Sequence, residues 1–73
     1  MTYTAKFERI GRRRDVPDLV VVADTADQMA DAIWHYAKGF LGSKWYDVTV
    51  DLEAMRGSIE YGRFGRFTLE PVA

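Results

Sequence analysis

The chain has 73 residues, no cysteine and a formal net charge of −1 at pH 7. This length predicts a single small domain over residues 1–73, because a chain of this size has no material for a second core. Hydrophobic residues make up 48% and charged residues 29%, a balance that excludes a disordered chain. The missing cysteines exclude disulfides, thiol catalysis and cysteine-based zinc sites.

Hydropathy and charge also limit the location and the partners. No apolar run approaches the ~18 residues of a membrane span, and no signal-peptide pattern opens the chain. We therefore expect a cytoplasmic protein that does not bind membranes. The near-neutral charge argues against a surface that binds nucleic acid over its whole extent. A domain this small buries only roughly 60% of its unfolded surface, so we expect a monomer or a weak homodimer.

Two strands and a charged loop are predicted before the helix. Residues 2–10 alternate in polarity, with one buried face. That face carries Tyr3, Ala5 and Phe7. Residues 11–17 combine a glycine, a run of charges and a proline, which is typical of a surface loop. The continuous β-branched run at residues 19–22 predicts a strand that is covered on both faces or lies in mid-sheet.

A helix is predicted to follow Thr25. Thr25 and Gln28 form a capping box, in which the threonine hydroxyl accepts from the Gln28 amide and the glutamine side chain returns to the Thr25 amide. Apolar residues then recur at spacings of three and four, which gives the helix one buried stripe. The stripe consists of Met29, Ile33, Tyr36, Ala37 and Phe40. Gly39 or Gly42 is expected to end the helix in a left-handed conformation.

Three further strands are predicted after the helix. They span residues 45–52, 58–61 and 66–70. The first is the clearest alternation in the chain, and the intervening residues 53–57 have the length of a hairpin turn. Gly62 and Gly65 permit a second tight turn or a bulge. The inward faces are expected to carry Tyr46, Val48, Val50, Leu52, Ile59, Tyr61, Phe67 and Leu69.

These elements predict an α+β fold with the order β-β-α-β-β-β. An antiparallel sheet of four to five strands, with the single amphipathic helix packed on one face, is the simplest arrangement that buries every apolar stripe. Trp34 and Trp45 are expected in the core or at its rim.

Catalytic and metal-binding signatures are weak in this sequence. Asp31 and His35 share one helix face, but two ligands do not complete a metal site and no cysteine can join them. Ser43 and Ser58 lie in no nucleophile motif. We therefore expect no catalytic, cofactor or metal site and no enzymatic activity.

The first candidate for partner binding is the arginine run of the first loop. Arg12, Arg13 and Arg14 form the densest positive charge in the chain and could grip phosphates. Asp15 and Asp18 stand beside them, so a merely solvated loop is the alternative.

The second candidate is a tandem Gly-Arg-Phe repeat at residues 62–67, which interleaves cations and aromatic rings. Its candidate contact residues are Arg63, Phe64 and Arg66. If Tyr61 and Phe67 point inward, Phe64 falls at the exposed tip of the turn between two arginines, a composition enriched at interface hot spots. The alternative is that the glycines only make the turn and Phe67 fills the core.

Four segments carry a resemblance to a known group of proteins. They are residues 7–12 (FERIGR), 15–19 (DVPDL), 32–37 (AIWHYA) and 48–53 (VTVDLE). In these segments the chain resembles small uncharacterised proteins of actinobacterial mobile elements, meaning integrative plasmids and phages. The likeness spans most of the chain, and its motifs are structural, so it assigns no functional residue. It implies a setting in which small accessory proteins bind nucleic acid or bind and block a host protein.

Two functions therefore compete. We expect a non-enzymatic protein-interaction module of the accessory, adaptor or inhibitor type, which works through an exposed sheet edge and the turn at residues 62–67. The alternative is a nucleic-acid-binding protein that uses the Arg12–Arg14 loop and the same turn. The ten basic side chains distinguish them, because a one-sided cluster supports nucleic acid and a scattered distribution supports a protein partner.

Overall fold

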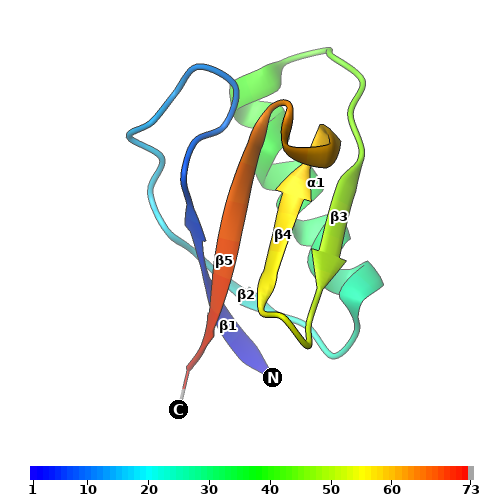
Figure 1. The fold of residues 1–73 in the computed structure, drawn as a ribbon. Coiled ribbons are helices and arrows are strands. Elements are labelled where there is room, and N and C mark those ends of the chain that lie inside the picture. The colour runs from blue at the N-terminus through cyan, green and yellow to red at the C-terminus, as the bar shows by residue number, and fades with distance from the viewer. Residues whose placement is uncertain (73) are drawn as a thin grey trace.

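A computed structural model of the chain describes residues 1–72. Its elements are β1 (Thr2–Phe7), β2 (Leu19–Val22), α1 (Ala26–Leu41), β3 (Val48–Asp51), β4 (Arg56–Ile59), the short 3₁₀ segment η1 (Glu60–Gly62) and β5 (Gly65–Pro71). The predicted α+β class and the order β-β-α-β-β-β are confirmed. Figure 1 shows α1 lying across one face of the sheet.

The sheet is antiparallel throughout, with the strand order β2-β1-β5-β4-β3. β1 and β5 therefore lie in its middle, and β2 and β3 form its edges. The expectation that residues 19–22 are covered on both faces or lie in mid-sheet is wrong, because β2 is an edge strand and Val20 and Val22 are 64% and 77% exposed. β-branched residues favour extended backbone wherever the strand lies, so such a run does not separate an edge strand from a central one.

Regular pairing covers less of the chain than the alternation predicts. β1 ends at Phe7, and Ile10 instead pairs with Arg13 across a tight turn, with N···O distances of 2.9 and 3.0 Å. β3 begins only at Val48. Residues 8–13 therefore begin the first loop, although the Glu8 amide still donates to the Arg66 carbonyl over 2.9 Å and Ile10 still packs in the core.

α1 begins and ends where the capping signals predict. The Thr25 hydroxyl accepts from the Gln28 amide over 3.1 Å. The Gln28 side chain accepts from the Asp24 amide over 2.7 Å rather than from the Thr25 amide, since it reaches one donor further. Gly42 ends the helix with a φ of 67°, and its amide donates to the Lys38 carbonyl over 2.9 Å. Within residues 1–72, no helix is long and apolar enough to cross a membrane.

The core lies between α1 and the inner face of the sheet. Its fully buried side chains include Ala5, Met29, Ile33, Ala37 and Ile59. Phe7 contacts both Tyr36 on the helix and Phe67 on β5, with ring centroids 5.4 Å apart in each pair. The helix stripe and the strand faces predicted to meet therefore do so.

Two aromatic residues are exposed, although Tyr61 is expected in the core and Trp45 in the core or at its rim. Tyr61 is 73% exposed and Trp45 is 79% exposed. The inward alternation of β4 stops at Ile59, because Glu60 and Tyr61 adopt left-handed backbone with φ values of 51° and 56°. The chain thus turns away before Tyr61 reaches the inner face. In the connection before β3, Tyr46 is 1% exposed and occupies the core position, which turns its neighbour Trp45 outward.

Candidate functional site

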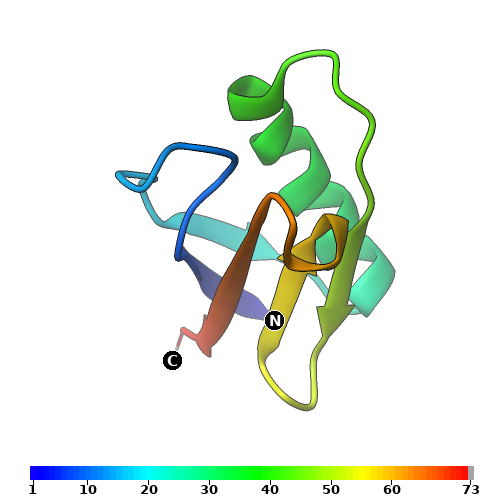
Figure 2. The same cartoon turned by 45° about the horizontal axis from the view of Figure 1, so that its top comes forward.

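Three connecting segments and one helix end meet at one end of the molecule. Figure 1 and Figure 2 show that they are the loop after β1, the C-terminal end of α1, the connection from α1 to β3 and the connection from β4 to β5. The N-terminus and the β3–β4 turn lie at the opposite end. Both predicted basic segments, residues 12–14 and 62–67, are therefore brought to the same end.

Arg9 ties the loop after β1 to the connection before β5. Its guanidinium donates to the carbonyl oxygens of Gly11, Gly62 and Arg63, over 2.7, 3.4 and 3.1 Å respectively. The Gly11 amide adds a hydrogen bond of 2.6 Å to the Phe64 carbonyl. Because these acceptors are neutral, the positive charge of Arg9 is not cancelled by them.

Gly65 allows this close approach of the two segments. It is buried, its φ is 144°, and a Cβ at this position would overlap the Arg9 carbonyl oxygen and lie 3.0 Å from the carbonyl carbon. No residue with a side chain fits here without moving the Arg9 backbone. The glycine of the repeat thus positions the site.

The meeting segments form a groove of about 520 Å³, which we call the basic groove. Its cationic lining residues are Arg9, Arg12, Arg13, Lys44 and Arg63. Two aromatic rings also line it: Phe40 lies 5.7 Å from the Arg13 guanidinium, and Phe64 lies 5.6 Å from the Lys44 ammonium. Among residues 1–72, no carboxylate side chain lines this groove.

Arg13 is the one groove cation with a carboxylate partner in the described chain. It donates to the two Asp15 oxygens over 3.0 and 3.4 Å. This hydrogen bond lowers the pKa of Asp15 and raises the pKa of Arg13. The exposed side chains of Arg12, Lys44 and Arg63 form no ion pair with any described residue, so their charges remain available to an anion.

Six exposed acidic residues lie away from the basic groove, in the first half of α1 and just before it, at the β3–β4 turn and near the end of β5. They are Asp24, Asp27, Asp31, Asp51, Glu53 and Glu70. Asp15, Asp47 and Glu60 instead lie in the segments that meet at the groove end. The charges are therefore separated only in part, and the groove lining itself carries five cations and no described carboxylate. Such a field orients an approaching polyanion toward the basic groove.

The structure brings some of the predicted contact residues together and separates others. Those that line the basic groove are Arg12, Arg13, Arg63 and Phe64. Arg14 is exposed outside the groove, and Arg66 lies on the outer face of the sheet. The sequence pattern does not identify Arg9, Phe40 and Lys44 as groove residues, because no spacing in the sequence links their three segments.

Phe64 is not the exposed tip of the turn. It is half-buried and packs against the core, whereas Tyr61 is the exposed aromatic of this connection. The left-handed residues Glu60 and Tyr61 turn the chain early, so that Phe64 falls back onto the fold. The expectation for Phe64 is thereby corrected.

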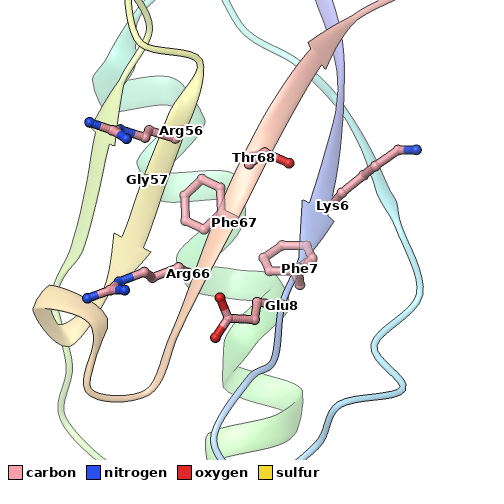
Figure 3. Close-up of a pocket in the computed structure, with 8 residues that line it drawn as sticks. All are labelled: Lys6, Phe7, Glu8, Arg56, Gly57, Arg66, Phe67 and Thr68. Carbon is pink, nitrogen blue, oxygen red and sulfur yellow. The ribbon is translucent and has the colours of Figure 1, made fainter.

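A second depression, of about 410 Å³, lies on the sheet face away from α1 (Figure 3). Arg56 and Arg66 extend toward one side, Lys6 extends toward the other, and the Glu8 carboxylate lies between them. Lys6 also pairs with Glu70 over 3.6 Å. Diverging cations with carboxylates among them do not make a focused anion site, which distinguishes this depression from the basic groove.

The histidine on α1 has one acidic neighbour. His35 Nε2 lies 3.5 Å from Asp31 Oδ1, and both side chains are exposed. The described part of the chain contains no group of three or more histidine, cysteine or acidic side chains placed to hold a metal ion.

Comparison with protein-family models, with curated proteins and with solved structures gives no significant match. The resemblance to proteins of mobile elements therefore stays a prediction.

Proposed function

We propose that the protein binds nucleic acid, without catalysis, through the basic groove. The observation that carries this proposal is the convergence of five cationic side chains, from three separate segments, on a groove lined by no described carboxylate. Convergence matters because affinity for a phosphate backbone grows with the number of cations that contact it. The near-neutral net charge of the chain favours a protein partner. The position of the cations in one groove supports nucleic acid instead, and binding depends more on that position than on the net charge.

The groove cations divide into two roles in this proposal. Arg12, Lys44 and Arg63 have no carboxylate partner and contact phosphates directly. Arg9 and Arg13 already donate to carbonyl oxygens and to Asp15, so they hold the shape of the groove and add to its field. The acidic residues that lie away from the groove repel the same phosphates, which favours one orientation of the complex.

Fluorescence anisotropy with labelled oligonucleotides at about 50 and 200 mM salt tests this proposal. The double variant Arg12→Ala/Arg63→Ala should bind more weakly and should reduce the salt slope by about two, because each lost phosphate contact removes about one. Lys6→Ala/Arg56→Ala is the matched control, since it removes two cations from the outer sheet face. No binding by the wild type at low salt, or an equal loss in the control, would contradict the proposal.

The edge of β2 favours a second candidate function, the binding of a protein partner. The Ala23 amide donates to the Met1 carbonyl over 2.9 Å, so in an antiparallel ladder the backbone groups of Val20 and Val22 point away from β1. Neither charge nor proline interrupts β2, and both valine side chains are exposed. An extended segment of another protein can add a strand at such an edge.

Two substitutions at Val20 distinguish a contact made by the backbone amide from a contact made by the side chain. Val20→Pro removes an outward amide and leaves the β1–β2 hydrogen bonds in place, whereas Val20→Thr keeps the amide. With a synthetic peptide of alternating threonine and valine as the probe, amide NMR shifts should concentrate at Val20 and Val22. They should vanish in Val20→Pro and persist in Val20→Thr; shifts elsewhere would contradict strand addition.

A further inference from the structure

We infer that the exposed ring of Tyr61 is a stacking platform for an unpaired base, and that the ligand of the basic groove is single-stranded nucleic acid. This inference rests on the proposed function and adds to it the strandedness of the ligand. It also adds a contact residue that does not line the groove. Three features that occur together support the inference. The Tyr61 ring is exposed, its backbone is strained, and the carbonyl of the next residue accepts a hydrogen bond from Arg9.

Tyr61 is the middle one of three consecutive residues with left-handed backbone. The φ values are 51° at Glu60, 56° at Tyr61 and 93° at Gly62. Residues with a Cβ pay a steric penalty in this region, which glycine avoids and asparagine tolerates. The ring is 73% exposed and therefore contributes little packing in return. Strain of this kind concentrates at ligand-binding sites, where the surrounding structure enforces it.

Hydrogen bonds hold the strained turn on both sides. The Glu60 amide donates to the Asp47 carbonyl over 2.6 Å, and the Asp47 amide donates to the Glu60 carboxylate over 3.0 Å. On the other side, the Arg9 guanidinium binds the carbonyl oxygens of the two residues that follow Tyr61. The ring is thus presented from a fixed backbone, and a pre-organised contact loses less entropy when the ligand binds.

A base can stack on Tyr61 only if its face is free. This condition holds in a single strand and fails inside a duplex, where each base is stacked between its neighbours. The phosphates next to a base on Tyr61 can reach Arg63, which is two residues away and lines the basic groove. The exposed side of α1 offers a duplex no recognition helix, because Asp27 and Asp31 on it repel the phosphates beside a major groove.

Trp45 provides a matched control, because it is an equally exposed aromatic in different surroundings. It is 79% exposed, and the depression that it lines also contains Asp27, Asp31 and Asp47. In the described chain no lysine or arginine lines that depression. Both rings follow or precede a groove cation in the sequence, Lys44 for Trp45 and Arg63 for Tyr61. They differ in the three carboxylates around Trp45 and in the strained backbone of Tyr61.

The experiment compares a fluorescein-labelled single strand of roughly 12 nucleotides with the same strand annealed to its complement. The wild type should bind the single strand more tightly than the duplex. Tyr61→Ala and Tyr61→Asn should lower the affinity for the single strand by about 5- to 150-fold, the range of one base stacked on an aromatic ring. Tyr61→Phe and Trp45→Ala should leave that affinity within about two-fold of the wild type. The melting temperature of Tyr61→Asn should equal or exceed that of the wild type.

Three results would overturn the inference, and they are distinguishable from failure of the proposed function. Equal binding of single strand and duplex, unaffected by Tyr61→Ala but weakened by Arg12→Ala/Arg63→Ala, would remove the stacking platform and keep the proposed function. A loss in Tyr61→Phe as large as in Tyr61→Ala would assign the contact to the hydroxyl. A lower melting temperature in Tyr61→Asn would assign the ring to folding. Absence of salt-dependent binding to either probe would remove both proposals.

Discussion

Gly57 is the position at which one added methyl group should have a large effect on folding. It lies in β4, opposite Phe67 of β5 and Val50 of β3. A Cβ at this position would lie 2.8 Å from Phe67 Cε2 and closer still to Phe67 Cζ and to the Thr49 carbonyl oxygen. The Phe67 ring is 2% exposed and packs against Phe7, so moving it aside would disturb the core contact between the two rings.

Gly57→Ala should therefore destabilise the fold. Inserting a methylene-sized group into a packed core typically costs about 1–3 kcal/mol. For 73 residues, an unfolding entropy of about 2.1 cal/mol/K per residue amounts to roughly 0.15 kcal/mol/K at the melting temperature. The expected fall in melting temperature is about 7–20 °C.

Gly39→Ala is the matched control for the same chemical change. Gly39 is exposed near the end of α1, and a Cβ there meets no atom within 4 Å. The added methyl group should stabilise this variant by about 0.5–1 kcal/mol, because alanine has the higher helix propensity. Thermal melts followed by circular dichroism measure both variants. Coincident melts of Gly57→Ala and the wild type would show that Phe67 and β3 shift without strain, and would refute the reasoning.

Three further predictions concern the core, the turn and a buried phenol. Ile33→Ala should lower the free energy of unfolding by about 2–5 kcal/mol, because Ile33 is fully buried, and a urea titration that coincides with the wild type would contradict its place in the core. Phe64→Ala should lower the free energy of unfolding by about 1–3 kcal/mol, because the ring is half-buried against the core. A melting curve equal to that of the wild type would indicate that Phe64 is exposed at the tip of the turn. Burial raises the pKa of Tyr46 above its ordinary value of 10.0, so the folded protein holds this proton more tightly than the unfolded chain. Stability should then fall as the pH rises above about 10, and urea titrations at successive pH values should show a smaller slope for Tyr46→Phe.

Local signals account for the part of the fold that the sequence predicts. The Thr25 cap, the helix stripe and the alternation in β1, β3 and β5 each act within a few residues, and each was recovered. The strand order depends on pairing between β1 and β5, which are the first and last strands of the chain. Alternation carries no information about such partners, and for this reason β2 was expected in mid-sheet although it lies at an edge.

The sequence predicts several residues of the candidate site but does not predict that they lie together. Arg12, Arg13, Arg63 and Phe64 were identified as two separate basic segments, and their meeting in one groove depends on the fit of Gly65 against the Arg9 backbone. Arg9 itself was assigned to a strand by the alternation of residues 2–10. Because β1 ends at Phe7, the Arg9 side chain instead binds the carbonyl oxygens of the turn.

The backbone of η1 explains two results at once. It is the reason why the strand prediction fails at Tyr61, and it is the reason why the ring of the proposed stacking platform is exposed. Alternation assigns Tyr61 to the core only if the backbone stays extended through residue 61, and the left-handed conformations of Glu60 and Tyr61 break that condition. The same two residues move the ring from the inner face of the sheet to the solvent beside the basic groove. Positions at which local rules fail in this way are expected at sites where function, more than stability, selects the residue. Glycine or asparagine at residue 61 would be less strained at this φ than tyrosine, and the stacking proposal gives the exposed ring a role that folding does not.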